Sequence, residues 1–334
     1  MVTLRKPIES LARLNRQARE RSFDIEDIDW GRSVERARPW MPEPLGLLYY
    51  ATSYRRLDAG VRRRYNQLAA LSLCEQFILF EQAVIRALPG VLARRDLPAE
   101  LRESLRHFIV EEQKHIEMFW RLLERSEPGF YRKRTPKLAL PSLFHSVMMD
   151  CAVSSPRLFL AWIWLTIFLE ERTLFVSRQF LRAQRQMPET IDPLHAEVHA
   201  FHFKDEVRHC QIDQHLLTVL YDPQPRWKKS LCGEMFHHAL RAFVFPGRST
   251  RRILALLGKE LPYLRDSVIP RLLAELPQIG ASPEFHMNLF SPTALPRTLR
   301  LISLYPEHAE ARRLLPLAPW ALTRSDAGVA APGR

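Results

Sequence analysis

One five-residue pattern occurs twice in this chain and restricts its fold more than any other feature. The runs Glu111–His115 (EEQKH) and Asp205–His209 (DEVRH) both read acid-Glu-x-x-His, and their glutamates lie 94 positions apart. Each run falls inside a long helical pattern. Because residues three apart share one face of a helix, the glutamate and the histidine of each run can reach a common point in a helix bundle.

Each of these two helices follows another long helix that carries a glutamate among apolar residues. The residues three, four and seven positions on either side of Glu81 are all apolar, so Glu81 lies in the middle of a core stripe. Glu171 has a similar stripe, whereas Glu75 and Glu170 have poorer ones. We expect Glu81 and Glu171 to face the core, with Glu75 and Glu170 as the alternatives.

This order of elements predicts a centre that binds two metal ions. A Glu from each of two helices and a Glu-x-x-His from each of two others form the ligand set of di-iron and di-manganese carboxylate bundles. Carboxylates bridge and neutralise the ions, and imidazoles supply neutral nitrogen ligands that suit iron. Taken singly, each element could be a surface motif or a glutamate paired with Arg or Lys. Together they predict a di-metal site with the ligands Glu81, Glu112, His115, Glu171, Glu206 and His209.

Further histidines lie upstream of the second motif. His202 precedes Glu206 by four positions and therefore shares its helix face. It is either a core histidine bonded to a carboxylate or a third histidine ligand. His195 and His199 continue the same stripe a turn or more away, and we expect both to be structural.

The first acid of each repeat, Glu111 or Asp205, has two interpretations. It is either a solvated charge or a carboxylate that accepts the outer N–H of a ligand histidine, which fixes the tautomer and raises the basicity of the ring. We favour the second interpretation for both residues.

The remaining patterns indicate a mostly α chain. Strand signals are weak, because no run of alternating β-branched residues lies between turn pairs. Long helical patterns span 58–88, 98–126, 156–184 and 193–220, and shorter ones span 226–244, 249–275 and 294–314. We predict a four-helix bundle with additional flanking helices. The expected organisation is an N-terminal arm packed on the core (1–57), a single helical-bundle domain (58–320) and a disordered tail (321–334).

The charge and the cysteine pattern of the chain indicate which kinds of binding partner and which cellular compartment to expect. The formal net charge of +12 is spread along the chain without a zinc-finger, RRM or KH signature, so nucleic-acid binding is not expected. No nucleotide-binding glycine loop is present. The longest apolar stretch, Leu158–Leu169, is too short to cross a bilayer, and no signal-peptide core is present. The four cysteines form no CxxC pair, which is typical of reduced thiols in a cytoplasmic protein.

Three segments resemble the p-aminobenzoate N-oxygenase family of ferritin-like di-iron oxygenases. They are Cys74–Gln82 (CEQFILFEQ), Phe108–His115 (FIVEEQKH) and Phe201–His209 (FHFKDEVRH), and the resemblance covers about 60–220. A histidine four residues before the second Glu-x-x-His is an extra ligand in that family, so the resemblance makes His202 a ligand. The sequence departs from the family pattern at Glu111, where Asp is more usual. The spacing from Glu171 to Glu206 is also longer by about one helical turn, which keeps Glu170 open.

The resemblance implies a ferritin-like bundle that holds two iron ions, with manganese as the alternative. It implies oxidation of an amine, often an arylamine, to the hydroxylamine or further towards nitro, in specialised metabolism. The reaction would use O2 and external electrons. Since no flavin or nicotinamide motif is present, the electrons are expected from a separate ferredoxin or reductase, and the basic chain favours an acidic one. The oligomeric state stays open, with a homodimer as one option.

Two other functions use the same ligand types. One is a di-iron hydroxylase or desaturase that acts on carbon, and the other is a ferritin-like metal-binding protein without oxygenase activity. A histidine-rich site argues against metal storage, and the aromatic residues near the motifs are mostly Phe and Trp rather than the Tyr of a radical-generating subunit.

Overall fold

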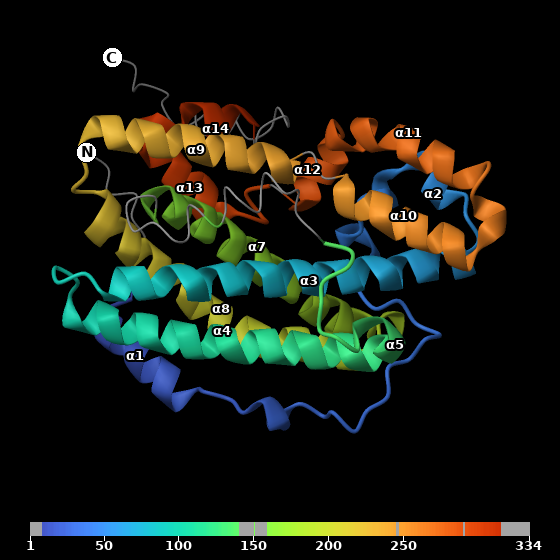
Figure 1. Ribbon diagram of the computed structural model, residues 1–334, viewed down its shortest axis with the longest axis horizontal. Helices are drawn as coiled ribbons and strands as arrows, with labels where there is room; N and C mark the ends of the chain where they lie inside the picture. The colour runs from blue at the N-terminus through green and yellow to red at the C-terminus, as the bar shows by residue number, and fades with distance from the viewer. Residues whose placement is uncertain (1–8, 140–149, 151–158, 245–246, 290, 315–334) are drawn as a thin grey trace, which may run out of the picture.

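Four long helices form the centre of the computed structural model, which describes residues 9–139, 150, 159–244, 247–289 and 291–314 (Figure 1). They are α3 (Ala59–Leu92), α4 (Ala99–Ser126), α7 (Phe159–Gln186) and α8 (Pro193–Leu216). Within these described ranges the chain contains no strand. The mostly α class and the four-helix bundle with flanking helices are confirmed.

The ends of these helices follow from their sequence with one exception. The Asp58 side chain accepts a hydrogen bond from the backbone of Val61 and starts α3. We expected α3 to stop before Pro89, but it continues to Leu92. The side chain of Arg102 donates to the carbonyls of Leu92 and Arg94, so α4 satisfies acceptors that the end of α3 leaves open.

The helices pair in the order of the chain. α3 and α4 form one antiparallel hairpin, α7 and α8 form the other, and the two hairpins meet mainly through α4 and α8. α8 starts at the capping residue Asp192 and continues into a π-helical turn, Leu217–Tyr221. This arrangement places both acid-Glu-x-x-His motifs on neighbouring helices.

The N-terminal arm begins on the outside of α4 and α8 and ends beside helices of the C-terminal third (Figure 1). It contains α1 (Leu11–Glu20), η1 (Ile25–Asp27), η2 (Glu43–Leu45), η3 (Leu47–Tyr50) and α2 (Thr52–Arg55). Trp40 is fully buried and stacks on His195, and the Asn66 side chain accepts hydrogen bonds from the backbone of Trp40 and Met41. The arm therefore contributes apolar surface to the core, while the domain boundary at residue 57 stays a prediction.

The C-terminal third covers the outer face of α7 and one end of α3 (Figure 1). Its elements are α9 (Arg226–Val244), α10 (Arg248–Glu260), η6 (Pro262–Leu264), α11 (Val268–Gly280), α12 (Pro283–Leu289), α13 (Pro296–Leu304), η7 (Pro306–His308) and α14 (Ala309–Leu314). The short elements α5 (Pro128–Tyr131) and η4 (Pro188–Thr190) follow α4 and α7. A Cβ at Gly233 would lie 2.3 Å from the Glu307 carbonyl, so α9 approaches η7 closely only because of this glycine. The predicted tail, 321–334, lies outside the described residues.

Among the helices of the described ranges, one is long and apolar enough to qualify as a membrane span. It is α3, and 72% of its apolar window is buried inside the protein. Length and composition alone do not distinguish a span from a core helix, and the burial of α3 is what its position in the bundle requires.

Candidate metal centre

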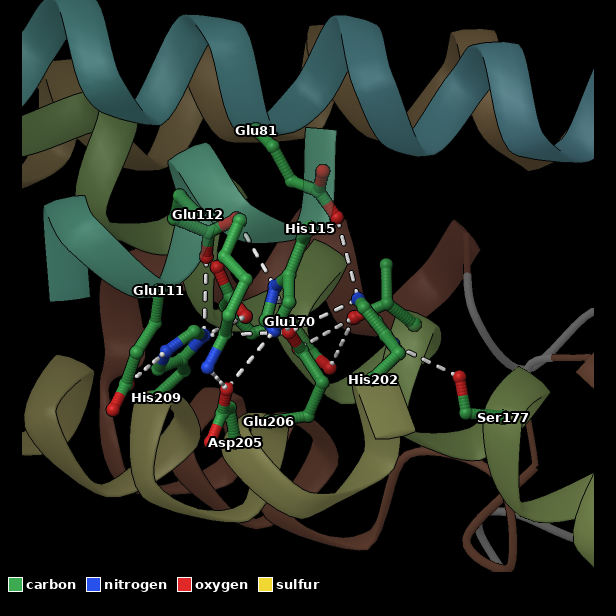
Figure 2. Close-up of polar contacts among 12 residues, drawn as sticks. Glu81, Glu111, Glu112, His115, Glu170, Ser177, His202, Asp205, Glu206 and His209 are labelled. Atoms are coloured by element: carbon green, nitrogen blue, oxygen red, sulfur yellow. Dashed lines mark hydrogen bonds and ion pairs between the residues drawn. The ribbon is translucent and has the colours of Figure 1, made fainter. Parts of the chain in front are cut away.

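Acidic and imidazole side chains from all four long helices converge at one level of the bundle (Figure 2). None is more than 1% exposed. They are Glu81 from α3, Glu112 and His115 from α4, Glu170 from α7, and His202, Glu206 and His209 from α8.

The two Glu-x-x-His motifs face each other across the contact between α4 and α8. His209 Nδ1 lies 3.0 Å from Glu112 Oε1 and 3.3 Å from Glu206 Oε1. His115 Nδ1 lies 3.6 Å from a carboxylate oxygen of Glu112 and 3.6 Å from one of Glu206. One ligand atom from each of these residues lies within 4.8 Å of the others, so the group could hold one metal ion.

A second group overlaps with the first and extends it towards α3. It consists of Glu81, His115 and His202, again with ligand atoms within 4.8 Å of one another. His202 Nε2 lies 3.3 Å from Glu81 Oε1 and 3.2 Å from Glu206 Oε1. Glu170 Oε2 approaches His209 Nδ1 to 3.6 Å from the α7 side. Two adjacent cation positions are what a di-metal centre requires.

Several metal-ligating atoms of this cluster lack the hydrogen bonds that buried polar atoms normally make. Among the described residues, neither oxygen of Glu112 or Glu170 has a hydrogen-bond partner, and the same is true of Nδ1 of His115 and His209. Four buried carboxylates would be costly without cations, and two divalent ions would balance their charge. The residues present therefore fit a pair of metal ions.

Without a metal, protons compensate part of this charge. Burial, reinforced by neighbouring carboxylates, raises the pKa of Glu81 and of Glu170 well above the usual range. For Glu112 and Glu206 burial acts in the same direction, but nearby imidazoles outweigh it and lower the pKa. Burial lowers the pKa of His115, yet the hydrogen bond to Asp205 and the negative charges of the neighbouring carboxylates outweigh burial and raise it to about 10. Metal binding therefore competes with protons.

On α7 the structure brings Glu170, the alternative, to the cluster in place of the expected Glu171. Glu171 does not reach the cluster: its carboxylate accepts hydrogen bonds from the backbone N–H groups of Arg297 (2.7 Å) and Thr298 (2.6 Å) at the start of α13. Glu170 occupies the expected place instead. Both faces of α7 are buried, one by the bundle and one by α13 and α9, so an apolar stripe did not identify the face that points to the centre.

The alternative for α3 has a structural role. Glu75 is fully buried, accepts a hydrogen bond from the Tyr131 hydroxyl (2.6 Å), and accepts others from the backbone of Lys137, Leu138 and Ala139. It therefore fixes the segment that follows α5, while Glu81, six residues later, faces the cluster (Figure 2).

The first acid of each repeat contacts the histidine of the other repeat. Asp205 Oδ2 lies 3.2 Å from His115 Nε2, and Glu111 Oε2 lies 2.9 Å from His209 Nε2. Arg208 in turn donates to both Glu111 and Asp205. Each outer ring nitrogen can thus donate to a carboxylate, which leaves the Nδ1 lone pair directed at the centre.

The third histidine is oriented differently. Nδ1 of His202 lies 3.0 Å from the buried Ser177 hydroxyl, which also lies 3.3 Å from His199 Nδ1, so Nε2 faces the carboxylates (Figure 2). His199 lies outside the cluster and stacks on Phe180. His195 also lies outside, with Nε2 2.9 Å from the Ser126 hydroxyl. Both positions agree with the structural roles expected for these two histidines.

Several side chains that contact the cluster residues or their carboxylate partners were not predicted from the sequence. Lys114 and Arg208 each precede the histidine of a motif, and Lys114 Nζ lies 2.9 Å from Asp205 Oδ2, so the repeat could have been read as acid-Glu-x-base-His. The Thr173 hydroxyl donates to Glu206 (2.8 Å), and Ser177 contacts His202. No spacing rule picks out these two hydroxyls, because their role depends on packing between α7 and α8.

Comparison with known proteins identifies one family. The family model described as p-aminobenzoate N-oxygenase AurF matches residues 6–252, which include every member of the cluster. Among curated proteins, no sequence matches the chain.

Proposed function

Because the chain belongs to the p-aminobenzoate N-oxygenase AurF family, we propose that it oxidises the nitrogen of an amine of the arylamine type. Membership makes it a non-haem di-iron monooxygenase. The observation that supports nitrogen oxidation in this chain is the position of His202. Its Nε2 lies within 3.3 Å of carboxylates from α3 and α8, which adds a third imidazole to a ligand set that has two in most di-iron bundles.

The residues that would hold the two ions come from all four helices. We assign Glu112, His115, Glu206 and His209 to the contact between α4 and α8, with Glu81, His202 and Glu170 completing the site from either side. Two iron ions bound there would supply the reduction of O2 and the transfer of one oxygen atom to the substrate. Manganese is the alternative metal.

The protein's own contribution is to hold the ligands and to exclude water. Glu111 and Asp205 accept the outer N–H of His209 and His115, so each imidazole is held in the tautomer whose Nδ1 can bind a metal. The complete burial of the cluster keeps bulk water away from the place where O2 is reduced.

The reaction requires a source of electrons. Converting an amine and O2 to a hydroxylamine and water consumes two electrons and two protons. We propose a ferredoxin or a reductase as the donor, and the formal net charge of +12 favours an acidic protein. The buried free thiols of Cys74, Cys210 and Cys232 are in keeping with a cytoplasmic location. A homodimer is compatible with all of these features.

A hydroxylase or desaturase that acts on carbon would use the same ligand types, so the substrate has to distinguish the two reactions. The experiment is iron analysis of the purified protein, followed by one turnover of the reduced protein with O2 and a panel of arylamines and matched arenes without nitrogen. Hydroxylamine or nitro products would support the proposal. Ring or alkyl hydroxylation would favour the carbon-oxidising alternative, and two bound irons without any product would favour a metal-binding protein.

A further inference from the structure

A buried carboxylate outside the metal cluster has no partner in the part of the chain that the structure describes. Asp213 lies on α8, one helical turn beyond His209, and is 1% exposed. Neither of its carboxylate oxygens makes a hydrogen bond to a described residue. Buried carboxylates that only support a fold are normally satisfied, as Glu75 and Glu171 are here.

Asp213 lines a small cavity inside the bundle next to the cluster. The other lining residues are apolar except Thr166, and they are Val84, Leu88, Phe108, Trp162, Ile163, Thr166 and Leu216. Each of the four helices contributes a lining residue within one turn of a cluster residue: Val84 after Glu81, Phe108 before Glu112, Thr166 before Glu170, and Asp213 after His209. The cavity is therefore the layer of the bundle that adjoins the proposed metal site.

Arg297 is the cationic side chain outside the metal cluster that influences Asp213 electrostatically. Burial raises the pKa of Asp213 well above the usual range, and although nearby imidazole and guanidinium groups, including that of Arg297, lower it, burial prevails. No ion pair joins Arg297 to Asp213, and Nη1 of Arg297 also lacks a hydrogen bond. The Thr166 hydroxyl donates to the Trp162 carbonyl, so it does not satisfy Asp213.

We propose that Asp213 binds the amino group of the substrate; this assignment deepens the proposed function and rests on it. A carboxyl oxygen accepts an N–H bond and leaves the nitrogen lone pair free, as oxidation at nitrogen requires. The apolar wall suits an aryl or alkyl body, as in most small-molecule sites. The space has room for about one water molecule, which matches an amino group, so the rest of a substrate enters by displacing Leu88, Leu216 or Trp162 side chains.

The test uses the metal-free full-length protein, so that its outcome does not depend on catalysis. Aniline and its apolar counterpart toluene are the probes, and Leu216→Ala is included to enlarge the cavity while leaving Asp213 in place. We expect aniline to bind the Leu216→Ala protein at least about tenfold more tightly than toluene does, and we expect this preference to vanish in Leu216→Ala/Asp213→Leu. Equal binding of both probes with Asp213 present would overturn the proposal.

A second measurement separates a binding role from a structural one. If Asp213 awaits a ligand, Asp213→Leu should raise the midpoint of thermal unfolding of the metal-free protein by about 2–4 °C, because a buried carboxylate without a partner is removed. If Asp213 supports the fold through Arg297, Asp213→Leu and Arg297→Gln should both lower it, and the proposal fails. Iron content and turnover of the unaltered protein test the oxygenase separately.

Discussion

The two adjacent glutamates of α7 allow the metal site to be tested by a pair of matched substitutions. Glu170→Gln and Glu171→Gln change neighbouring buried carboxylates into amides of the same shape. The structure predicts opposite consequences, because Glu170 faces the cluster and Glu171 faces the start of α13.

The magnitudes follow from the hydrogen bonds of each side chain. An amide has one acceptor oxygen, so Glu171→Gln leaves at least one of the N–H groups of Arg297 and Thr298 without an acceptor, which costs about 1–3 kcal/mol. Burial raises the pKa of Glu171, so relief of carboxylate desolvation offsets part of this loss, and we expect about 1–2 kcal/mol. Glu170 has no hydrogen bond to lose among the described residues, so Glu170→Gln should not lower the stability of the metal-free protein.

The assay combines thermal unfolding of the metal-free proteins with iron analysis after reconstitution. We expect Glu171→Gln to unfold about 2–4 °C lower for each kcal/mol lost and to retain its iron. We expect Glu170→Gln to unfold normally and to lose iron relative to the parent protein. A Glu170→Gln protein with the iron content of the parent, or a Glu171→Gln protein that loses iron at unchanged stability, would refute the assignment.

Three further predictions concern the histidines. Ser177→Ala removes the partner of His202 Nδ1, so metal affinity measured by competition with a chelator should fall about tenfold or more, whereas Ser177→Thr should restore it. His202→Ala should leave a folded protein with altered reactivity towards O2, and unchanged iron content and turnover would disprove a ligand role. The pKa of His115 is raised to about 10 from 6.5, so its contribution to the stability of the metal-free protein is complete below about pH 6.5 and disappears as the pH rises to about 10. Urea unfolding across this range should show that decline, and metal loading should abolish it.

Much of the centre could be predicted because its geometry repeats along the chain. The i,i+3 relation in each motif fixes which side chains share a face, and that relation needs no tertiary information. Glu81, Glu112, His115, His202, Glu206 and His209 are brought together as expected (Figure 2).

The choice between Glu170 and Glu171 could not be made from the sequence, because different neighbours bury the two faces of α7. An apolar stripe identifies a buried face but does not say what buries it, so Glu171, which faces α13, resembles a core-facing residue as well as Glu170 does. The end of α3 also differs from the prediction, because the helix continues through Pro89 to Leu92, where the side chain of Arg102 on α4 donates to a terminal carbonyl. The surroundings of Asp213 and Ser177 are formed by residues of other helices, and a single sequence does not reveal which residues those are.

The two halves of the repeat differ at positions that lie on either side of the centre. Four residues before the motif glutamate, α8 has His202 whereas α4 has Phe108; seven residues after the single glutamate, α7 has Ser177 whereas α3 has Leu88. The polar pair forms the extra imidazole site, and the apolar pair lines the cavity. Four residues after the motif histidine, the polar residue lies on the cavity side and the apolar residue on the histidine side. There α8 has Asp213, which lines the cavity, and α4 has Phe119, which contacts His202. One end of the centre is therefore closed by a third histidine and the aromatic rings around it, and the other combines apolar walls with one carboxylate. If Asp213 binds the amino group as proposed, a substrate would meet the metal ions from the second end, and its position would depend on residues at which the two halves of the repeat differ.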